Sequence, residues 1–205
     1  MKPSNKLMKR LSLYLFLILF TLQTPSQADD IRDFQIEGMT VGDSLLDYFT
    51  EDEIKNALKN QYPNSKKYTV RLFDSLPKFE VYDGVQATYK TNDKKYKIYG
   101  LEGVLWFDTT DNNIKNCYKK KDEIVKEITE FFKDELITIN EDNDKHVADE
   151  SGKSTYKSID FWFNSGDKIG VLCNDWSEEM ELADRLKVTI DLKEFLNWID
   201  NEAYP

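Results

Sequence analysis

The chain has 205 residues, with 28 Lys and Arg against 38 Asp and Glu, so its formal net charge is −10. Such an acidic chain is a poor candidate for nucleic-acid binding, because nucleic-acid strands require dense Lys and Arg on the protein surface. An aromatic content of 13% with only 8 Gly and 5 Pro excludes a disordered chain and predicts a sizeable core. One His and two Cys leave too few ligands for a zinc or haem site, and we expect no cofactor.

The first 28 residues have the organisation of a cleaved signal peptide. Four basic residues and no acids accompany a 12-residue apolar run, Leu11 to Leu22, and small residues at Ser26 and Ala28 suit cleavage after Ala28. A membrane anchor is the alternative, but 12 helical residues would span only about 18 Å of a roughly 30 Å hydrocarbon core. We therefore expect residues 29–205 to form a soluble mature chain that is periplasmic or secreted and does not insert into a membrane.

Export changes both the charge of the chain and the meaning of its cysteines. Cleavage would remove four positive charges, which leaves 24 basic and 38 acidic residues and a net charge of −14. In an oxidising compartment the only two cysteines, Cys117 and Cys173, are expected to pair. Cys117 lies on the apolar face of a predicted helix over residues 114–136, and Cys173 alternates with Val171 on the apolar side of a predicted strand over residues 168–174. Both sulfurs should therefore face the same core.

Two short helices are expected ahead of the first strand. Asp43 or Ser44 can cap the first of them. Thr50 and Glu53 have the spacing of a capping box, so a second helix should begin there and run to about Asn60.

Alternating apolar and polar residues predict two groups of strands on either side of the 114–136 helix. These strands cover residues 68–72, 81–89, 96–108, 155–164, 168–174 and 185–191. The polar segment over residues 140–154 should be mobile, with a hairpin tip at residues 150–153, and a helix over residues 192–203 should close the chain.

Strands grouped in hairpins favour an α+β fold with antiparallel sheet and helices packed on one face, in the order α-βββ-α-βββ(β)-α. This order suggests two repeats of a helix followed by a meander, although the residues themselves show no repeat. No linker rich in Pro, Gly or Ser divides the chain, so residues 29–205 should form one domain.

Familiar catalytic motifs are missing from the sequence. It contains no Gly-x-Ser-x-Gly, no His-Glu-x-x-His and no glycine-rich phosphate loop. A Ser-His-Asp triad or a nucleophilic Cys would depend on His146, which lies in the polar segment. We therefore expect no catalytic residue and lean toward a protein that is not an enzyme.

One polar segment has part of the spacing of a calcium-binding loop. The segment Asn140–Asp144 alternates oxygen ligands as an EF-hand loop does at its start. However, Lys145 stands where the loop needs glycine, and Ser151 stands where it needs a bidentate Glu. The alternative is a weak, irregular calcium site in this segment or at Asp108 and Asp111.

Two aromatic segments are the best candidates for a ligand or partner surface. Trp162 alternates with Asp160 on the side of its strand opposite Phe161, and an aromatic ring beside a polar group can stack on a sugar or contact a partner. Asp175 and Trp176 follow another strand and could form a binding loop. The alternatives are that a helix covers this face and makes Trp162 part of the core, and that Trp176 anchors a turn.

Two resemblances extend this interpretation. The segment Gly38–Asp43 reads Gly-Met-Thr-Val-Gly-Asp and resembles the Gly-Met-Thr opening of outer-membrane assembly lipoproteins and β-lactamase-inhibitor-like modules, which are small exported helix-plus-sheet domains. The lipobox Cys of the lipoproteins is absent here, so the resemblance does not imply a lipid anchor. The layout of Ile36–Phe49, Cys117, Cys173–Trp176 and Trp198–Tyr204 resembles a family of small exported bacterial proteins with no assigned activity.

These observations predict an exported binding or protein-interaction module of the cell envelope, with an unknown protein, small molecule or glycan as its partner. The alternative is a small carboxylate-dependent hydrolase acting on a glycan-type substrate. A hydrolase of that kind would need a deep cleft with two acids roughly 5–10 Å apart. A binding module would instead show an exposed apolar patch or a free sheet edge.

Overall fold

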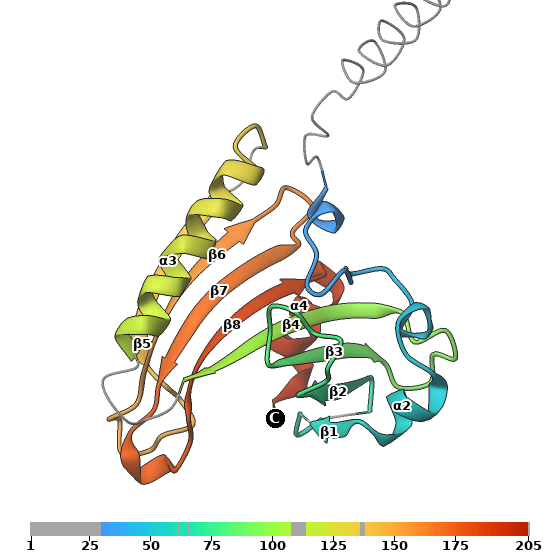
Figure 1. The fold of residues 1–205 in the computed structure, drawn as a ribbon, viewed down its shortest axis with the longest axis horizontal. Helices are drawn as coiled ribbons and strands as arrows, with labels where there is room; N and C mark the ends of the chain where they lie inside the picture. The colour runs from blue at the N-terminus through green and yellow to red at the C-terminus, as the bar shows by residue number, and fades with distance from the viewer. Residues whose placement is uncertain (1–29, 61, 65, 108–113, 136–137, 205) are drawn as a thin grey trace, which may run out of the picture.

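One antiparallel sheet of eight strands, in the order β1-β2-β3-β4-β8-β7-β6-β5, organises the computed structural model (Figure 1). The structure describes residues 30–60, 62–64, 66–107, 114–135 and 138–204. The predicted signal peptide and the predicted acidic pair Asp108 and Asp111 lie outside these residues. The strands are β1 (Leu58–Asn60), β2 (Tyr68–Asp74), β3 (Gly84–Lys90), β4 (Ile98–Phe107), β5 (Thr138–Lys145), β6 (Thr155–Trp162), β7 (Lys168–Asp175) and β8 (Asp184–Asp191).

Helices and helical turns precede, separate and follow the strands. They are η1 (Ile31–Asp33), η2 (Leu45–Asp47), α2 (Glu51–Asn56), α3 (Ile114–Phe131), η3 (Glu178–Met180), α4 (Lys193–Trp198) and the π-helical turn η4 (Ile199–Ala203). None of the helices in the described ranges is long and apolar enough to cross a lipid bilayer.

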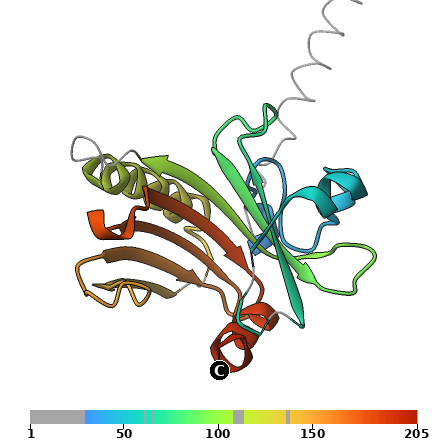
Figure 2. The ribbon, with the colours of Figure 1, turned by 90° about the horizontal axis from the view of Figure 1, so that it is seen from below.

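The two halves of the chain have the same connectivity. Helix α2 is followed by the meander β1 to β4, and helix α3 is followed by the meander β5 to β8. The last strands of the two meanders, β4 and β8, pair from Gly100↔Asp191 to Phe107↔Asp184 and join the halves into one twisted sheet (Figure 2). The predicted α+β order is matched only loosely, because each short or long helix is followed by four strands, including the unpredicted β1 and β5, and the sheet dominates the fold.

The N-terminal helical turns differ in length from the prediction. Ser44, not Asp43, is the cap of η2, which is a single 3-10 turn. Thr50 and Glu53 form the predicted capping box, and α2 begins at Glu51. The helix ends at Asn56 because the Arg71 guanidinium donates a hydrogen bond to the Ala57 carbonyl at 3.0 Å and holds the following residues against β2 as strand β1.

The capping box gives a first testable prediction. Replacing Thr50 with Ala should lower the free energy of unfolding by about 1 kcal/mol, because the Glu53 N–H then loses its hydroxyl acceptor. Urea denaturation measures the change. Thr50→Ser is the matched control, since it keeps the hydroxyl and should stay within a few tenths of a kcal/mol of the wild type. An alanine variant as stable as the wild type would show that the box does not hold the helix.

The prediction that residues 140–154 are a mobile segment is wrong for its first part, whereas the predicted hairpin tip at residues 150–153 lies between two paired strands, β5 and β6. Residues Thr138–Lys145 form β5, an edge strand that pairs with β6 along its whole length and whose side chains are all exposed. Main-chain hydrogen bonds define this strand, because its Asn, Asp and Glu side chains have low β-propensity. In an extended strand the alternating oxygens of Asn140, Asp142 and Asp144 lie about 7 Å apart, so they do not converge on one ion as a calcium loop would.

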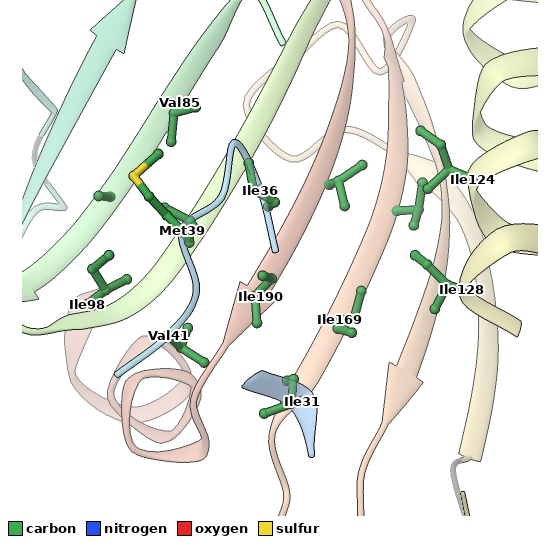
Figure 3. Packing of buried hydrophobic residues seen from close by; sticks show 14 of the residues in the cluster. Ile31, Ile36, Met39, Val41, Val85, Ile98, Ile124, Ile128, Ile169 and Ile190 are labelled. Atoms are coloured by element: carbon green, nitrogen blue, oxygen red, sulfur yellow. The ribbon is translucent and has the colours of Figure 1, made fainter. Parts of the chain in front are cut away.

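The core fills one face of the sheet, which we call the inner face. Ile124 and Ile128 of α3 pack against it from one side, and the N-terminal segment 31–41 crosses it beside them (Figure 3). The sheet contributes side chains with no solvent exposure that include Phe161, Ile169, Val171, Val188 and Ile190.

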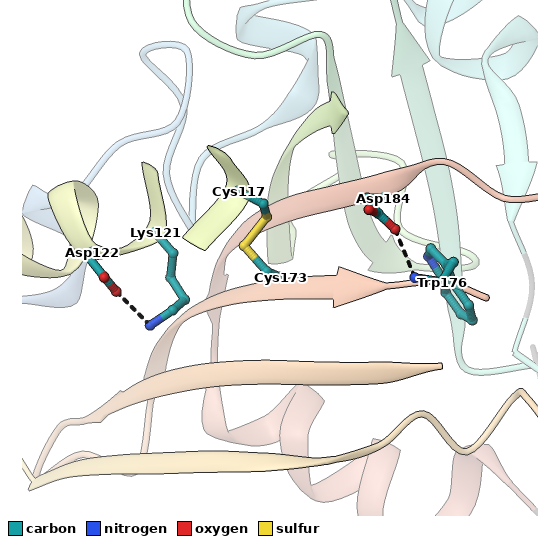
Figure 4. The surroundings of a disulfide bond; sticks show 6 residues. All are labelled: Cys117, Lys121, Asp122, Cys173, Trp176 and Asp184. Atoms are coloured by element: carbon teal, nitrogen blue, oxygen red, sulfur yellow. Dashed lines mark hydrogen bonds and ion pairs between the residues drawn. A yellow bond between two sulfur atoms is a disulfide. The ribbon is translucent and has the colours of Figure 1, made fainter. Parts of the chain in front are cut away.

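A disulfide joins α3 to this inner face. Cys117 and Cys173 are bonded, with their Cα atoms 6.1 Å apart, and both are fully buried (Figure 4). The predicted pairing is confirmed. It ties α3 to β7 across a sequence separation of 56 residues.

The last helix packs on the opposite face, which we call the outer face. Phe195, Trp198 and Ala203 form a second buried cluster with Tyr68 of β2. Gly100 of β4 permits this contact, because a Cβ there would lie 2.7 Å from the Phe195 ring. The prediction that the helices pack on one face therefore holds for α3 and is wrong for α4.

Candidate functional site

Strand register brings a set of polar and aromatic side chains to the outer face across β4, β8, β7 and β6. In the paired strands every second residue points to this side, opposite the buried residues of the inner face. The set comprises Glu102, Trp106, Tyr156, Asp160, Trp162, Lys168, Asn174, Arg185, Lys187, Thr189 and Asp191, with the apolar Leu172 among them. Most of these side chains are half-buried, so they are held by neighbours while remaining accessible to a ligand.

The predicted residues Asp160 and Trp162 lie together at one end of this set. Lys168 connects them, because its Nζ is 3.4 Å from Asp160 Oδ1 and 5.5 Å from the centre of the Trp162 ring. Gly170 leaves room beside this group, since a Cβ there would lie 2.9 Å from both Asp160 Oδ1 and Thr189 Oγ1. Trp162 is half-buried on the outer face and does not join the buried core.

Asp191 and Glu102 add two more carboxylates to the same face. Burial raises the pKa of Asp191 to about 6, against the opposing influence of the Lys168 ammonium and the Thr189 hydroxyl. Glu102 is neutralised by Lys187, whose Nζ lies 2.8 Å from its Oε2 in a largely buried ion pair. Asp191 is thus the carboxylate on this face whose charge is most costly.

The other predicted pair, Asp175 and Trp176, does not join Asp160 and Trp162. Trp176 is only 7% exposed, and its main-chain N–H donates a hydrogen bond to Asp184 Oδ1 at 2.8 Å, so it anchors a turn (Figure 4). Asp175 follows Cys173 by two residues in the same strand, so its side chain points to the inner face as that of Cys173 does. Trp176 also lies roughly 25 Å along the strands from Trp162. The four residues therefore do not form one site.

A cation that was not predicted from the sequence lies between two tryptophans. The Arg185 guanidinium is 5.9 Å from the centre of the Trp106 ring and 5.6 Å from that of Trp176. His146 packs on Trp176, and the centres of the two rings are 4.1 Å apart. The signal in the sequence was the alternation of Arg185 and Lys187 with apolar residues in β8, which gives a basic side to one strand of an acidic chain.

The hairpin tip after β5 holds His146 and Trp176 in place. Asp149 accepts hydrogen bonds from the Ser154 N–H and hydroxyl at 2.9 and 2.6 Å, and from the Ser177 hydroxyl at 3.0 Å. The hydrogen bonds from Ser154 and Ser151 hold the pKa of Asp149 well below its ordinary range. A charged Asp149 thus ties the tip that begins at His146 to the residue after Trp176.

Neither a known protein family, nor a curated protein, nor a solved structure matches the chain. The chemistry of the site is therefore judged on its own geometry.

The outer face carries side chains that can recognise a ligand. It combines aromatic rings, two ion pairs, and a guanidinium that lies between two tryptophans. In the described ranges no group of three or more His, Cys, Asp or Glu residues is placed to hold a metal ion. Fixed charges between half-buried aromatic rings are typical of surfaces that bind and orient a ligand.

Proposed function

We propose that this protein is an exported, soluble binding or protein-interaction module of the cell envelope whose ligand surface is the outer face of the sheet. The single observation that carries the proposal is the row of half-buried aromatic and charged side chains from Trp162 to Arg185 on that face. A folded domain does not need such residues for its core, which the inner face already provides. The buried disulfide supports export, because disulfides persist in oxidising compartments.

The edge strand β5 supports the same proposal. Among the described residues β5 pairs only with β6, so the main-chain groups along its other edge are available to another strand. Its acidic side chains would discourage self-association and favour a basic segment of a partner. The one apolar side chain of this strand, Ile139, is 48% exposed.

A carboxylate-dependent hydrolase is the second candidate, and one observation favours it. Asn174 pairs with Arg185, so Asp175 lies directly across from Asp184. Burial raises the pKa of both carboxyls, and Asp184 raises that of Asp175 further. However, Asp184 is 7% exposed and accepts a hydrogen bond from the main-chain N–H of Trp176, which is the arrangement of a structural anchor. We therefore place the hydrolase second.

Affinity purification from the periplasmic fraction tests the binding function. Wild-type protein should retain a partner that Trp162→Ala loses, with affinity reduced roughly 30-fold, because large aromatic residues dominate the energetics of interfaces. Phe131→Ala is the matched control, since Phe131 is an aromatic residue of α3 that is 43% exposed and lies away from the outer face.

The comparison is decisive in both directions. A partner lost with Trp162→Ala and kept with Phe131→Ala would support the outer face as the binding surface. A partner lost only with Phe131→Ala, or no specific partner at all, would contradict the proposal. Near-ultraviolet circular dichroism of both variants checks that they remain folded.

A further inference from the structure

A small pocket lies on the outer face at the Arg185 end of the strands. Its volume is about 180 Å³, and its walls include His146, Tyr156, Leu172, Asn174, Arg185 and Lys187. This space is equivalent to about six water molecules, so it suits one small chemical group and not a drug-sized ligand.

Arg185 is the unusual residue of this pocket. Its Nε is fully buried and has no hydrogen-bond partner among the described residues, and none of their carboxylates forms an ion pair with it. Burial lowers its pKa from the ordinary value, but a guanidinium stays charged in proteins. A buried polar group without a partner is costly, and Arg185 lines the pocket, where a bound group can pair with its guanidinium. Trp106 and Trp176 flank the guanidinium and limit its movement.

The neighbouring polar groups can also donate hydrogen bonds. His146 Nδ1 accepts the Ala148 N–H at 3.2 Å, which places the ring proton on Nε2 when the imidazole is neutral. Burial, followed by the charges of Arg185 and Lys187, lowers the pKa of His146, so the neutral form prevails near pH 7. Asn174 is 3% exposed, and its side-chain amide makes no hydrogen bond to another described residue. Its amide can therefore serve a bound group.

The number of unpaired charges selects the ligand. Lys187 is already neutralised by Glu102 at 2.8 Å, so Arg185 is the one unpaired cation that the described lining residues provide. One planar guanidinium matches one carboxylate through two parallel hydrogen bonds. A phosphate dianion would need a second free cation. Leu172 and the ring of Tyr156 supply an apolar wall for the body of the ligand.

We propose that this pocket binds the carboxylate of a ligand with a small apolar body, either a free organic acid or the C-terminus of a peptide. The inference rests on the proposed binding function and names the chemistry that the outer face recognises. The carboxylate would lie against Arg185, with His146 and Asn174 as further donors, and the apolar body would lie over Leu172.

Tryptophan fluorescence provides the measurement, because Trp106 and Trp176 flank the guanidinium. The purified protein is titrated with N-acetyl-L-leucine, N-acetyl-L-leucinamide, the peptide Ala-Ala-Leu and inorganic phosphate. N-acetyl-L-leucine should bind with a Kd of about 1 mM, which is ordinary for a ligand of its size. The uncharged amide and inorganic phosphate should each bind at least tenfold more weakly. If Ala-Ala-Leu binds tenfold more tightly than N-acetyl-L-leucine, the natural ligand is the C-terminus of a peptide. If N-acetyl-L-leucine binds tenfold more tightly than the peptide, the natural ligand is a free organic acid.

Variants of the arginine test the assignment. Arg185→Gln should weaken binding of N-acetyl-L-leucine at least tenfold, and Arg185→Lys should weaken it several-fold, because lysine keeps the charge but loses the planar pair of donors. Arg32→Gln removes the same charge at an exposed position and should have no effect. Equal binding of acid and amide, tighter binding of phosphate, or full affinity in folded Arg185→Gln would overturn the proposal. Such a result would leave a Trp162-dependent partner unaffected, so the two proposals can fail separately.

Discussion

Replacing Cys117 and Cys173 together with alanine will lower the free energy of unfolding by about 4 kcal/mol. The disulfide closes a loop with a sequence separation of 56 residues, and its loss returns that loop's conformational entropy to the unfolded chain. Both cysteines are fully buried, so the substitution also removes packing atoms from the core. Urea denaturation of the double variant beside the oxidised wild type measures the difference.

Reduced wild-type protein is the control that separates the two contributions. It loses the covalent bond but keeps both sulfur atoms, so its stability should lie close to that of the double variant and slightly above it. Amide hydrogen exchange should rise most in α3, because the bond is the covalent tie between this helix and β7. A loss of less than 1 kcal/mol on reduction would mean that packing alone holds α3 on the sheet.

The parts of the fold that could be predicted from the sequence are those with a strong local signal. Thr50 and Glu53 form a capping box because three residues bring the hydroxyl and the carboxylate to each other's main-chain N–H groups. Val171 and Cys173 lie on one face because a strand alternates its side chains, and Cys117 lies inward because it falls on the apolar stripe of its helix. These rules need only neighbouring residues.

Features fixed by distant contacts could not be predicted in the same way. Strand β5 has a sequence typical of a solvated loop, and its main-chain bonds to β6 decide its structure. Helix α4 has an apolar stripe that would fit either face of a sheet. It takes the outer face because Gly100 makes space for Phe195 and because Tyr68 presents an aromatic surface there.

The candidate site divides along the same line. Alternation within one strand correctly placed Asp160 and Trp162 on the same face, opposite Phe161. The role of Arg185 could not be predicted, because it depends on contacts with the rings of Trp106 and Trp176, which belong to segments far apart in the chain. Only the register of β4, β7 and β8 brings these three side chains together.

Asp191 gives the second large effect, and its size depends on pH. Its pKa is about 6 in the folded protein, because burial disfavours the charged carboxylate. In the unfolded chain the pKa should be ordinary, about 3.9. Between these two values the native state keeps a proton that the unfolded state has released, so the free energy of unfolding falls as the pH rises through this window. The cost is complete above pH 6 and amounts to about 3 kcal/mol at most.

Asp191→Asn should therefore be more stable than the wild type at pH 7.5, by up to about 3 kcal/mol, and close to it at pH 4. The gain in stability is reduced by the lost attraction between the Asp191 carboxylate and the Lys168 ammonium. Lys168 keeps Asp160 as its ion-pair partner in the variant. Urea denaturation at several pH values between 4 and 8 measures the difference. Asp200→Asn is the control, since it makes the same change in charge at an exposed position and should leave the pH profile unaltered.

The outcome also bears on why a costly carboxylate lies on the outer face. Asp191 shares this face with Asp160 and Glu102, each of which has a lysine as its ion-pair partner. If Asp191→Asn gains stability at pH 7.5 and loses it on acidification, the wild type gives up folding free energy to keep a titratable carboxylate beside Lys168 and Thr189, as functional sites do. A variant that is less stable than the wild type at every pH would instead make Asp191 a structural acceptor whose charge the fold requires.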